Sequence, residues 1–334
     1  LAEKAIGNYQ VAIEAAQEAL AGLRISLGSE NPELYVNINS LASLLNAARR
    51  YEEAKPLFEE AIANRTRLLG ANHHKTLISV ATLSWMLIKM KRYEEARPLC
   101  ETVYEKRTEI LGAKHPKTLN SANILGWLCA LQGEYDSACS FLDIAIEGRI
   151  EQLGADHPKT LDSQMGYATT LFWKGDLEQA ELLFLKTIPA QEKALGMNHP
   201  TTIESIWDYV QLLEKSDRLS QAVTSSISLL DRCKQTPQKK HSLQRTIALS
   251  VSRWLWSLNE RDRALDHGAA FLDDPQTNSP VLMLEHGERL CAAQNPRGVT
   301  WLRQAMPLLK DTDQHRCQNL LAKFEVLLTN DAED

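Results

Sequence analysis

The sequence repeats itself every 42 residues, and this period limits the folds open to the chain. The dipeptide Leu-Gly occurs five times, at Gly28, Gly70, Gly112, Gly154 and Gly196, each glycine 42 residues after the last. Three residues after each glycine stands a polar residue, Asn31, His73, His115, His157 or His199, and in four of the five copies a proline follows it. A fixed period without insertions predicts a stack of similar units rather than two separate globular domains.

Each unit is predicted to hold two helices. The glycine suits a helix C-terminus, where a left-handed residue is needed, and the proline suits the first turn of the next helix. Small residues recur once in each predicted helix and would let the two helices of a pair approach closely. In the first helix they are Ala42, Ser84, Gly126, Ala168 and then Val210; in the second they are Ala54, Ala96, Ala138, Ala180 and Ala222.

This pattern resembles the tetratricopeptide repeat, in particular the 42-residue class found in kinesin-light-chain-like proteins. The matching residues are Leu-Gly, His-Pro-x-Thr and the turn with Gly133, Tyr135 and Ala138. The resemblance implies an all-α fold: a right-handed superhelical solenoid of antiparallel helix pairs with a C-terminal capping helix.

The register sets the expected boundaries. Residues 1–27 are predicted to form the second helix of a truncated repeat, and residues 238–310 two degenerate helix pairs, because His241, Ser252 and Ala264 keep the period after the Leu-Gly motif has gone. Residues 311–334 are predicted to be a capping helix and tail. Between them lie five full units, at 28–69, 70–111, 112–153, 154–195 and 196–237.

Composition narrows the function classes. The net charge of −6 argues against a general nucleic-acid binder. No apolar run reaches 18 residues and the N-terminus lacks an apolar signal segment, so neither a membrane span nor secretion is expected. The six cysteines form no Cys-x-x-Cys pair. They are interpreted as reduced, packed thiols of a cytoplasmic protein.

The tryptophans indicate a binding surface. In tetratricopeptide arrays the first helix of each pair lines the concave face, and helical spacing from the small residues predicts which side chains point there. Trp85 and Trp127, 42 residues apart, are expected to stack, and Ile78 and Ala81 belong to the same face. The predicted ligand groove comprises Asn39, Asn46, Trp85, Asn120, Asn123, Trp127, Asp162, Phe172, Trp173, Glu204, Trp207 and Gln211.

Two interpretations of these rings stay open: a ligand surface, or the packed interior of a tightly wound superhelix. In kinesin light chains the groove receives extended peptides through Asn and basic side chains. Asn39 and Asn123 match that pattern, but Ala81, Met165 and Trp207 depart from it and cations are few. The predicted ligand is therefore a protein or extended peptide with apolar or aromatic side chains, whose basic flanks would meet Asp162 and Glu204. The oligomeric state is left open.

The leading functional hypothesis is a non-enzymatic protein- or peptide-binding scaffold without cofactor or metal. No nucleophile, zinc or phosphate-loop motif is present, and the histidines recur one repeat apart, too far to share an ion. The interpretation of these histidines is that they order the turn where a helix begins. A second hypothesis is a sensor or autoinhibitory region of a larger NTPase-containing, NLR-type regulator. A third is an enzyme or small-molecule binder around Asp162, Trp173, Glu204 and Trp207.

Overall fold

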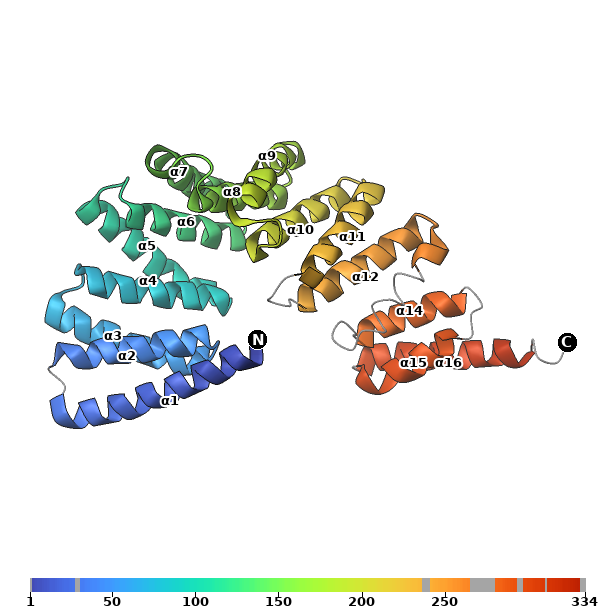
Figure 1. The fold of residues 1–334 in the computed structure, drawn as a ribbon, viewed down its shortest axis with the longest axis horizontal. Helices are drawn as coiled ribbons and strands as arrows, with labels where there is room; N and C mark the ends of the chain where they lie inside the picture. Colours follow the sequence, from blue (N-terminus) through green and yellow to red (C-terminus); the bar gives the residue numbers. More distant parts are fainter. Residues whose placement is uncertain are drawn as a thin grey trace. The chain divides into compact units, whose positions relative to one another are not determined.

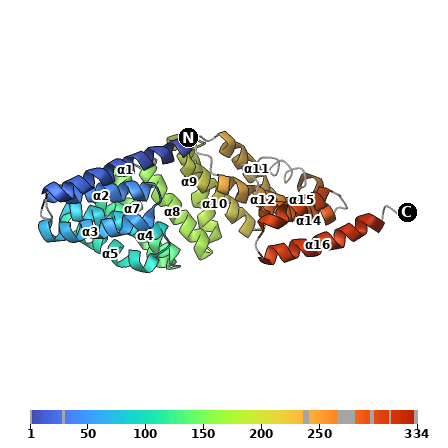
Figure 2. The ribbon, with the colours of Figure 1, turned by 90° about the horizontal axis from the view of Figure 1, so that it is seen from below.

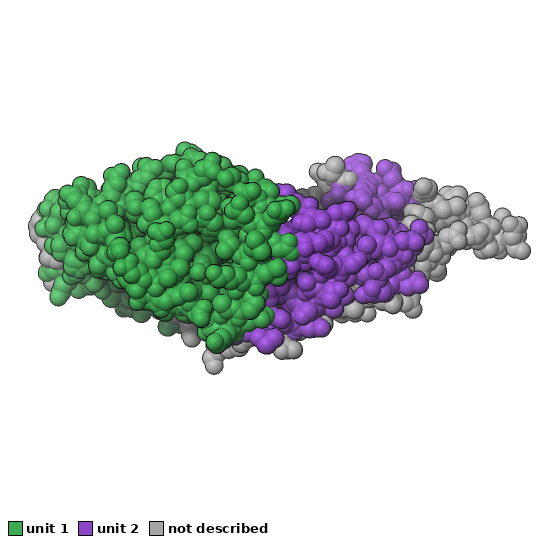
Figure 3. Space-filling model, turned by 90° about the horizontal axis from the view of Figure 1, so that it is seen from above, with its two compact units in different colours: residues 1–195 green, residues 196–334 purple. Residues whose placement is uncertain are grey.

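The computed structural model describes residues 2–27, 31–235, 241–264, 280–292, 297–309 and 311–330. Within these ranges all regular structure is helical and no strand occurs. The chain divides into two compact units, residues 1–195 and 196–334 (Figure 3). Among the described helices, none combines the length and the apolar character that a bilayer crossing needs.

Unit 1 is a series of helix pairs, which Figure 1 shows in order from blue to yellow-green. Its first helix, α1 (Ala2–Leu27), has no partner before it, as predicted for the second helix of a truncated repeat. The pairs that follow are α2 (Pro32–Ala47) with α3 (Tyr51–Leu69), α4 (His74–Lys89) with α5 (Tyr93–Leu111), α6 (Pro116–Leu131) with α7 (Tyr135–Leu153), and α8 (Pro158–Lys174) with α9 (Leu177–Leu195).

The first helices form the inner layer of this stack. Each second helix packs on the first helix of the next pair, and in addition α2 contacts α4, α4 contacts α6, and α6 contacts α8. Figures 1 and 2 show the same succession from two sides. Residues on α4, α6 and α8 can therefore share one surface, as the sequence predicted.

The small residues hold the pairs together. Ala42, Ala54 and Ala96 are fully buried, and so are their counterparts in later repeats. At Gly126 a Cβ atom would lie 2.7 Å from Leu142 Cγ, too close for any side chain. The predicted close approach of the two helices is confirmed.

The turn inside each pair carries the period in its backbone. A residue with positive φ stands there every 42 residues, at Arg49, Lys91, Gly133, Gly175, Asp217 and Asn259. The Leu-Gly glycines also have positive φ, but at Gly112 φ is 87° with ψ 157°. This is the region with extended ψ, open essentially to glycine alone, and not the left-handed helical conformation that the sequence suggested.

Unit 2 keeps the helical order with fewer motif residues. It contains α10 (Pro200–Lys215), α11 (Leu219–Gln235), α12 (His241–Ser257), α14 (Pro280–Ala292), α15 (Arg297–Ala305), the 3₁₀ turn η1 (Met306–Leu308) and α16 (Asp311–Asn330). The last helix, α16, packs on α15 and α14, as expected of a capping helix. The helix predicted after Ala264 lies mostly outside the described residues, and the exact repeat boundaries stay a prediction.

Candidate binding pocket

Histidine fixes where the first helices of unit 1 begin. The Nδ1 atoms of His73, His115 and His157 accept hydrogen bonds from the backbone N–H two residues later, at 3.3, 3.1 and 3.2 Å. Each histidine thus satisfies an amide that the helix leaves without a partner. Their role as turn and helix-start residues is confirmed, and it sets α4, α6 and α8 in equivalent positions.

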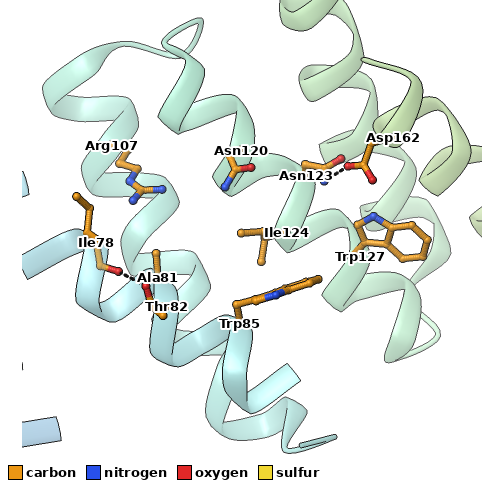
Figure 4. A pocket seen from close by; sticks show the side chains of 10 residues that line it. All are labelled: Ile78, Ala81, Thr82, Trp85, Arg107, Asn120, Asn123, Ile124, Trp127 and Asp162. Carbon is orange, nitrogen blue, oxygen red and sulfur yellow. Dashed lines mark hydrogen bonds between the residues drawn. The ribbon is translucent and has the colours of Figure 1, made fainter. Parts of the chain in front are cut away.

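A pocket of about 460 Å³ opens on the surface that α4, α6 and α8 share (Figure 4). We call it the tryptophan pocket. Residues of the predicted inner face supply most of its wall, and Thr82, Arg107 and Ile124 complete it. The expected residues that line it are Ile78, Ala81, Trp85, Asn120, Asn123, Trp127 and Asp162.

The two indole rings of the pocket are held differently. Trp85 is 37% exposed, and Lys89 Nζ lies 5.7 Å from the centre of its ring. Trp127 meets Trp173 edge to face, with centroids 6.3 Å apart and planes at 70°. The expected stacking of Trp85 on Trp127 is wrong, because the absence of a side chain at Gly166, whose Cβ would lie 3.0 Å from Trp127 Cε2, lets Trp127 lean onto α8.

Polar side chains at one end of the pocket form a network. Asn123 Nδ2 donates to Asp162 Oδ2 at 3.2 Å, and Asn123 Oδ1 accepts from Ser163 Oγ at 2.7 Å. Arg149 Nη1 lies 3.7 Å from Asp162 Oδ2. Burial raises the pKa of Asp162, while Arg149 and the Asn123 hydrogen bond oppose that rise. The carboxylate is thus oriented by two donors at the pocket edge.

Sequence reasoning missed three buried arginines, Arg65, Arg107 and Arg149, which are 7%, 6% and 4% exposed. They stand on the second helices α3, α5 and α7 and reach into the next pair. Arg107 Nη1 donates to the backbone carbonyl of Lys117 at 3.2 Å and to Ser121 Oγ at 2.8 Å. The signal was available, because the three arginines are 42 residues apart.

Arg107 gives the tryptophan pocket a positive charge. Burial lowers the pKa of both Arg107 and Arg149, but only Arg149 has a carboxylate, Asp162, that opposes the shift. Among the described residues no acidic side chain pairs with Arg107. A guanidinium group stays protonated under these conditions, so a buried cation without a counter-charge lines this pocket.

The remaining predicted residues lie elsewhere. Asn39 Oδ1 accepts from Ser79 Oγ at 2.8 Å, Asn46 Oδ1 is buried without a hydrogen-bond partner among the described residues, and Phe172 is buried. Glu204, Trp207 and Gln211 stand on α10 in unit 2.

Trp207 is one of the partly buried side chains against the core of unit 2. Its ring stacks on Trp254, with centroids 6.4 Å apart. Trp254 itself is buried, and its Nε1 donates to Glu214 Oε1 at 2.8 Å. Packing against an interior thus describes these two rings better than ligand contact.

The chemistry of the tryptophan pocket suits binding. It offers two indole faces, two primary amides, a cation and a carboxylate, and its polar groups are oriented by neighbouring side chains. In the described part of the chain no group of three or more His, Cys, Asp or Glu side chains is placed to hold a metal ion.

Comparison with known proteins places these helix pairs in a family. Two family models, both described as tetratricopeptide repeat, match residues 38–75 and residues 86–143 and 128–193. No curated protein matches the sequence.

Solved structures show the same architecture. A putative kinesin light chain with nearly identical TPR-like repeats from Podosopora anserina is 26% identical, covering 56% of this chain and 88% of its own, with a TM-score of 0.51. BtubC (BKLC) from P. vanneervenii is 14% identical over 69% of this chain and 90% of its own, with a TM-score of 0.52. The apo form of the quorum sensor NprR from B. thuringiensis is 13% identical over 90% and 84%, with a TM-score of 0.62. At these identities the last two show the fold alone. The chain is therefore a tetratricopeptide-repeat protein, and its 42-residue repeats are similar to those of kinesin light chain.

Proposed function

We propose that this protein is a non-enzymatic scaffold that binds an extended peptide segment of a partner protein in the tryptophan pocket. Tetratricopeptide-repeat proteins are typically protein-interaction scaffolds. The observation that carries the proposal is the pocket itself: Trp85 and Trp127, from neighbouring repeats, line one cavity of about 460 Å³ together with Asn120 and Asn123.

The pocket favours a peptide with an apolar or aromatic anchor. Ile78, Trp85, Ile124 and Trp127 provide the apolar wall, and rigid aromatic rings are common anchors at protein interfaces. Asn120 and Asn123 can each donate to and accept from a peptide backbone. Because the repeats are already stacked, the site needs little ordering when a ligand binds.

The charges set the expected flanks of that anchor. Asp162 lies at the end of the pocket where Arg149 and Asn123 hold it, so a basic flank of the ligand would face it. Arg107 changes the expectation drawn from sequence, since it offers a partner for a backbone carbonyl or a carboxylate of the ligand. The proposed ligand is thus aromatic or aliphatic at its centre, with a basic group toward Asp162 and an acceptor toward Arg107.

Selection from a random peptide library, followed by fluorescence polarisation with the enriched peptides, tests this proposal. We expect Trp85→Ala to weaken binding by about tenfold or more, in the range of an interface anchor. Leu182→Ala is the matched control: Leu182 is 70% exposed on α9 and lies outside the pocket, so affinity should not change. Equal affinity of the Trp85→Ala variant and the parent protein would exclude this pocket as the binding site.

A further inference from the structure

A second pocket of about 500 Å³ lies beside the first, and its wall is cationic. It is formed where α6 and α8 begin and α7 ends, and we call it the lysine pocket. Besides Lys117 and Lys159 it is lined by Arg107, Pro116, Leu119, Asn120, Arg149, Gln152, Leu153 and His157. Arg107 and Asn120 also line the tryptophan pocket, whereas the two lysines do not.

The four cations of the lysine pocket have little negative charge near them. No carboxylate is among its described lining residues. Asp162, 3.7 Å from Arg149 Nη1, offsets part of one charge. Glu151, the other acid in this neighbourhood, is paired with Lys114 at 2.7 Å. The excess is confined to this place in a protein whose net charge is −6.

The two guanidinium groups are part of a built wall. Arg149 Nη1 donates to the carbonyl of Lys159 at 2.6 Å, and Arg107 Nη1 donates to the carbonyl of Lys117 at 3.2 Å. Arg149 Nη2 also lies 3.5 Å from Asn120 Oδ1. These bonds fix each arginine to the helix turn that carries the neighbouring lysine, so the four cations keep their spacing without a ligand.

The lysines stand where a helix disfavours positive charge. The N-terminus of a helix carries a partial positive charge, so acidic residues are preferred there. The second helices of unit 1 follow this rule, with Glu94 and Glu95 in α5 and Asp136 in α7. In contrast, α6 and α8 have no acid in the first turn and carry Lys117 and Lys159 there. An arrangement that costs stability and repeats at the same pocket indicates a use for the charge.

From this geometry we propose that the lysine pocket binds a phosphate monoester group. A phosphate carries between one and two negative charges at neutral pH and three acceptor oxygens, which matches several convergent donors better than a carboxylate does. The cavity exceeds the size of a free phosphate ion, so the group belongs to a larger molecule. A phosphorylated side chain and a phosphorylated small molecule share this chemistry.

Titrations followed by ³¹P NMR line broadening test the assignment and distinguish the two sources. The probes are N-acetyl-O-phosphoserine amide and adenosine 5′-monophosphate, with N-acetylglutamate amide as a singly charged competitor. We expect saturable binding of one phosphate probe, and tighter binding of either probe identifies the source. No saturable binding of either probe, or displacement by N-acetylglutamate amide at equal concentration, would overturn the proposal.

Matched variants locate the site. Lys117→Ala with Lys159→Ala should weaken phosphate binding by about tenfold or more, because charged hydrogen bonds to the anion are lost. Lys75→Ala with Lys106→Ala removes the same charge from unit 1 outside the pocket and should leave binding unchanged. Equal losses in both double variants would show a nonspecific charge effect and sink the proposal. Since neither lysine of the pocket lines the tryptophan pocket, this result is independent of peptide binding there.

Discussion

The helix pairs of unit 1 and the helices that follow differ at one position of the repeat. Arg65, Arg107 and Arg149 occupy it in α3, α5 and α7, whereas Gln191 in α9 and Cys233 in α11 occupy it later, and all five are buried. Arg149 is hydrogen-bonded to Ser163 Oγ and the Lys159 carbonyl. The amide of Gln191 is 0% exposed, and neither its nitrogen nor its oxygen has a partner among the described residues.

This difference separates what builds the fold from what charges the inner face. Helix pairs persist in unit 2 without the arginine, and the left-handed turn residue persists as far as Asn259. The fold therefore rests on the small residues and the turn. The arginines add stability within unit 1 and supply the positive charge of both pockets.

The largest expected effect follows from removing one arginine. Arg149→Met should lower the free energy of unfolding by about 3 kcal/mol, because it leaves the Asp162 carboxylate and a buried hydroxyl without their donor. Urea unfolding followed by circular dichroism measures the loss, and hydrogen exchange in α7 and α8 locates it. Arg107→Met, which abandons no carboxylate, should cost less; equal losses would contradict the distinction between the two sites.

A second test exchanges a packing pair between the units. Gly126 and Leu142 of unit 1 correspond in register to Val210 and Ser226 of unit 2, so the larger side chain stands on opposite helices. Gly126→Val should cost about 2 kcal/mol through overpacking against Leu142. Adding Leu142→Ser should restore part of that stability in a double-mutant cycle. Additive losses would show that the two positions do not compensate for each other.

The position of Gln191 should respond with the opposite sign to that of Arg149. Gln191→Met removes a buried amide without hydrogen bonds, so we expect stability to rise by about 1 kcal/mol. Thermal unfolding and urea unfolding both report it. The same substitution, to methionine, would then destabilise at one repeat and stabilise at the next. A loss of stability at Gln191 would mean that its amide is satisfied in solution.

The smallest effect concerns the turn residue. Lys91 has φ 60°, where Gly133 and Gly175 stand in the following pairs. Lys91→Gly should raise stability by about 0.5 kcal/mol, because relief of left-handed strain outweighs the entropy that glycine loses on folding. The melting temperature measures the gain, and Gly133→Ala is the reciprocal control with the opposite sign. An unchanged melting temperature in both variants would remove the turn from the features that maintain the repeat.

The fold could be predicted because its determinants are local and periodic. A glycine, a histidine cap and two small residues recur at fixed distances, and each has a direct backbone or packing reason. Even the pair with weak motifs was found, since Ser252 and Ala264 keep the register and both are buried.

The site was predicted only in part because its geometry is not local. Trp85 and Trp127 were found from helical spacing on the first helices. Arg107 was missed, because it stands on a second helix and reaches a serine 14 residues later on the next helix. The orientation of Trp127 depends on Gly166, 39 residues further along the chain, which no single-helix pattern reveals. Trp207 was assigned to the groove from its register, but its ring packs on Trp254.

The glycine that ends each repeat has a consequence for how such a chain can change in length. At Gly112 and Gly154 the backbone dihedrals nearly coincide, with φ 87° and ψ 157° at the first and φ 89° and ψ 164° at the second. A gene segment encoding one period could thus be duplicated or excised between these codons, and both junctions would meet matching backbone geometry. Such an event adds or removes one helix pair, and with it one step of inner surface, while the neighbouring pairs keep their own structure. The length of ligand that the protein can span is then open to selection in increments of 42 codons.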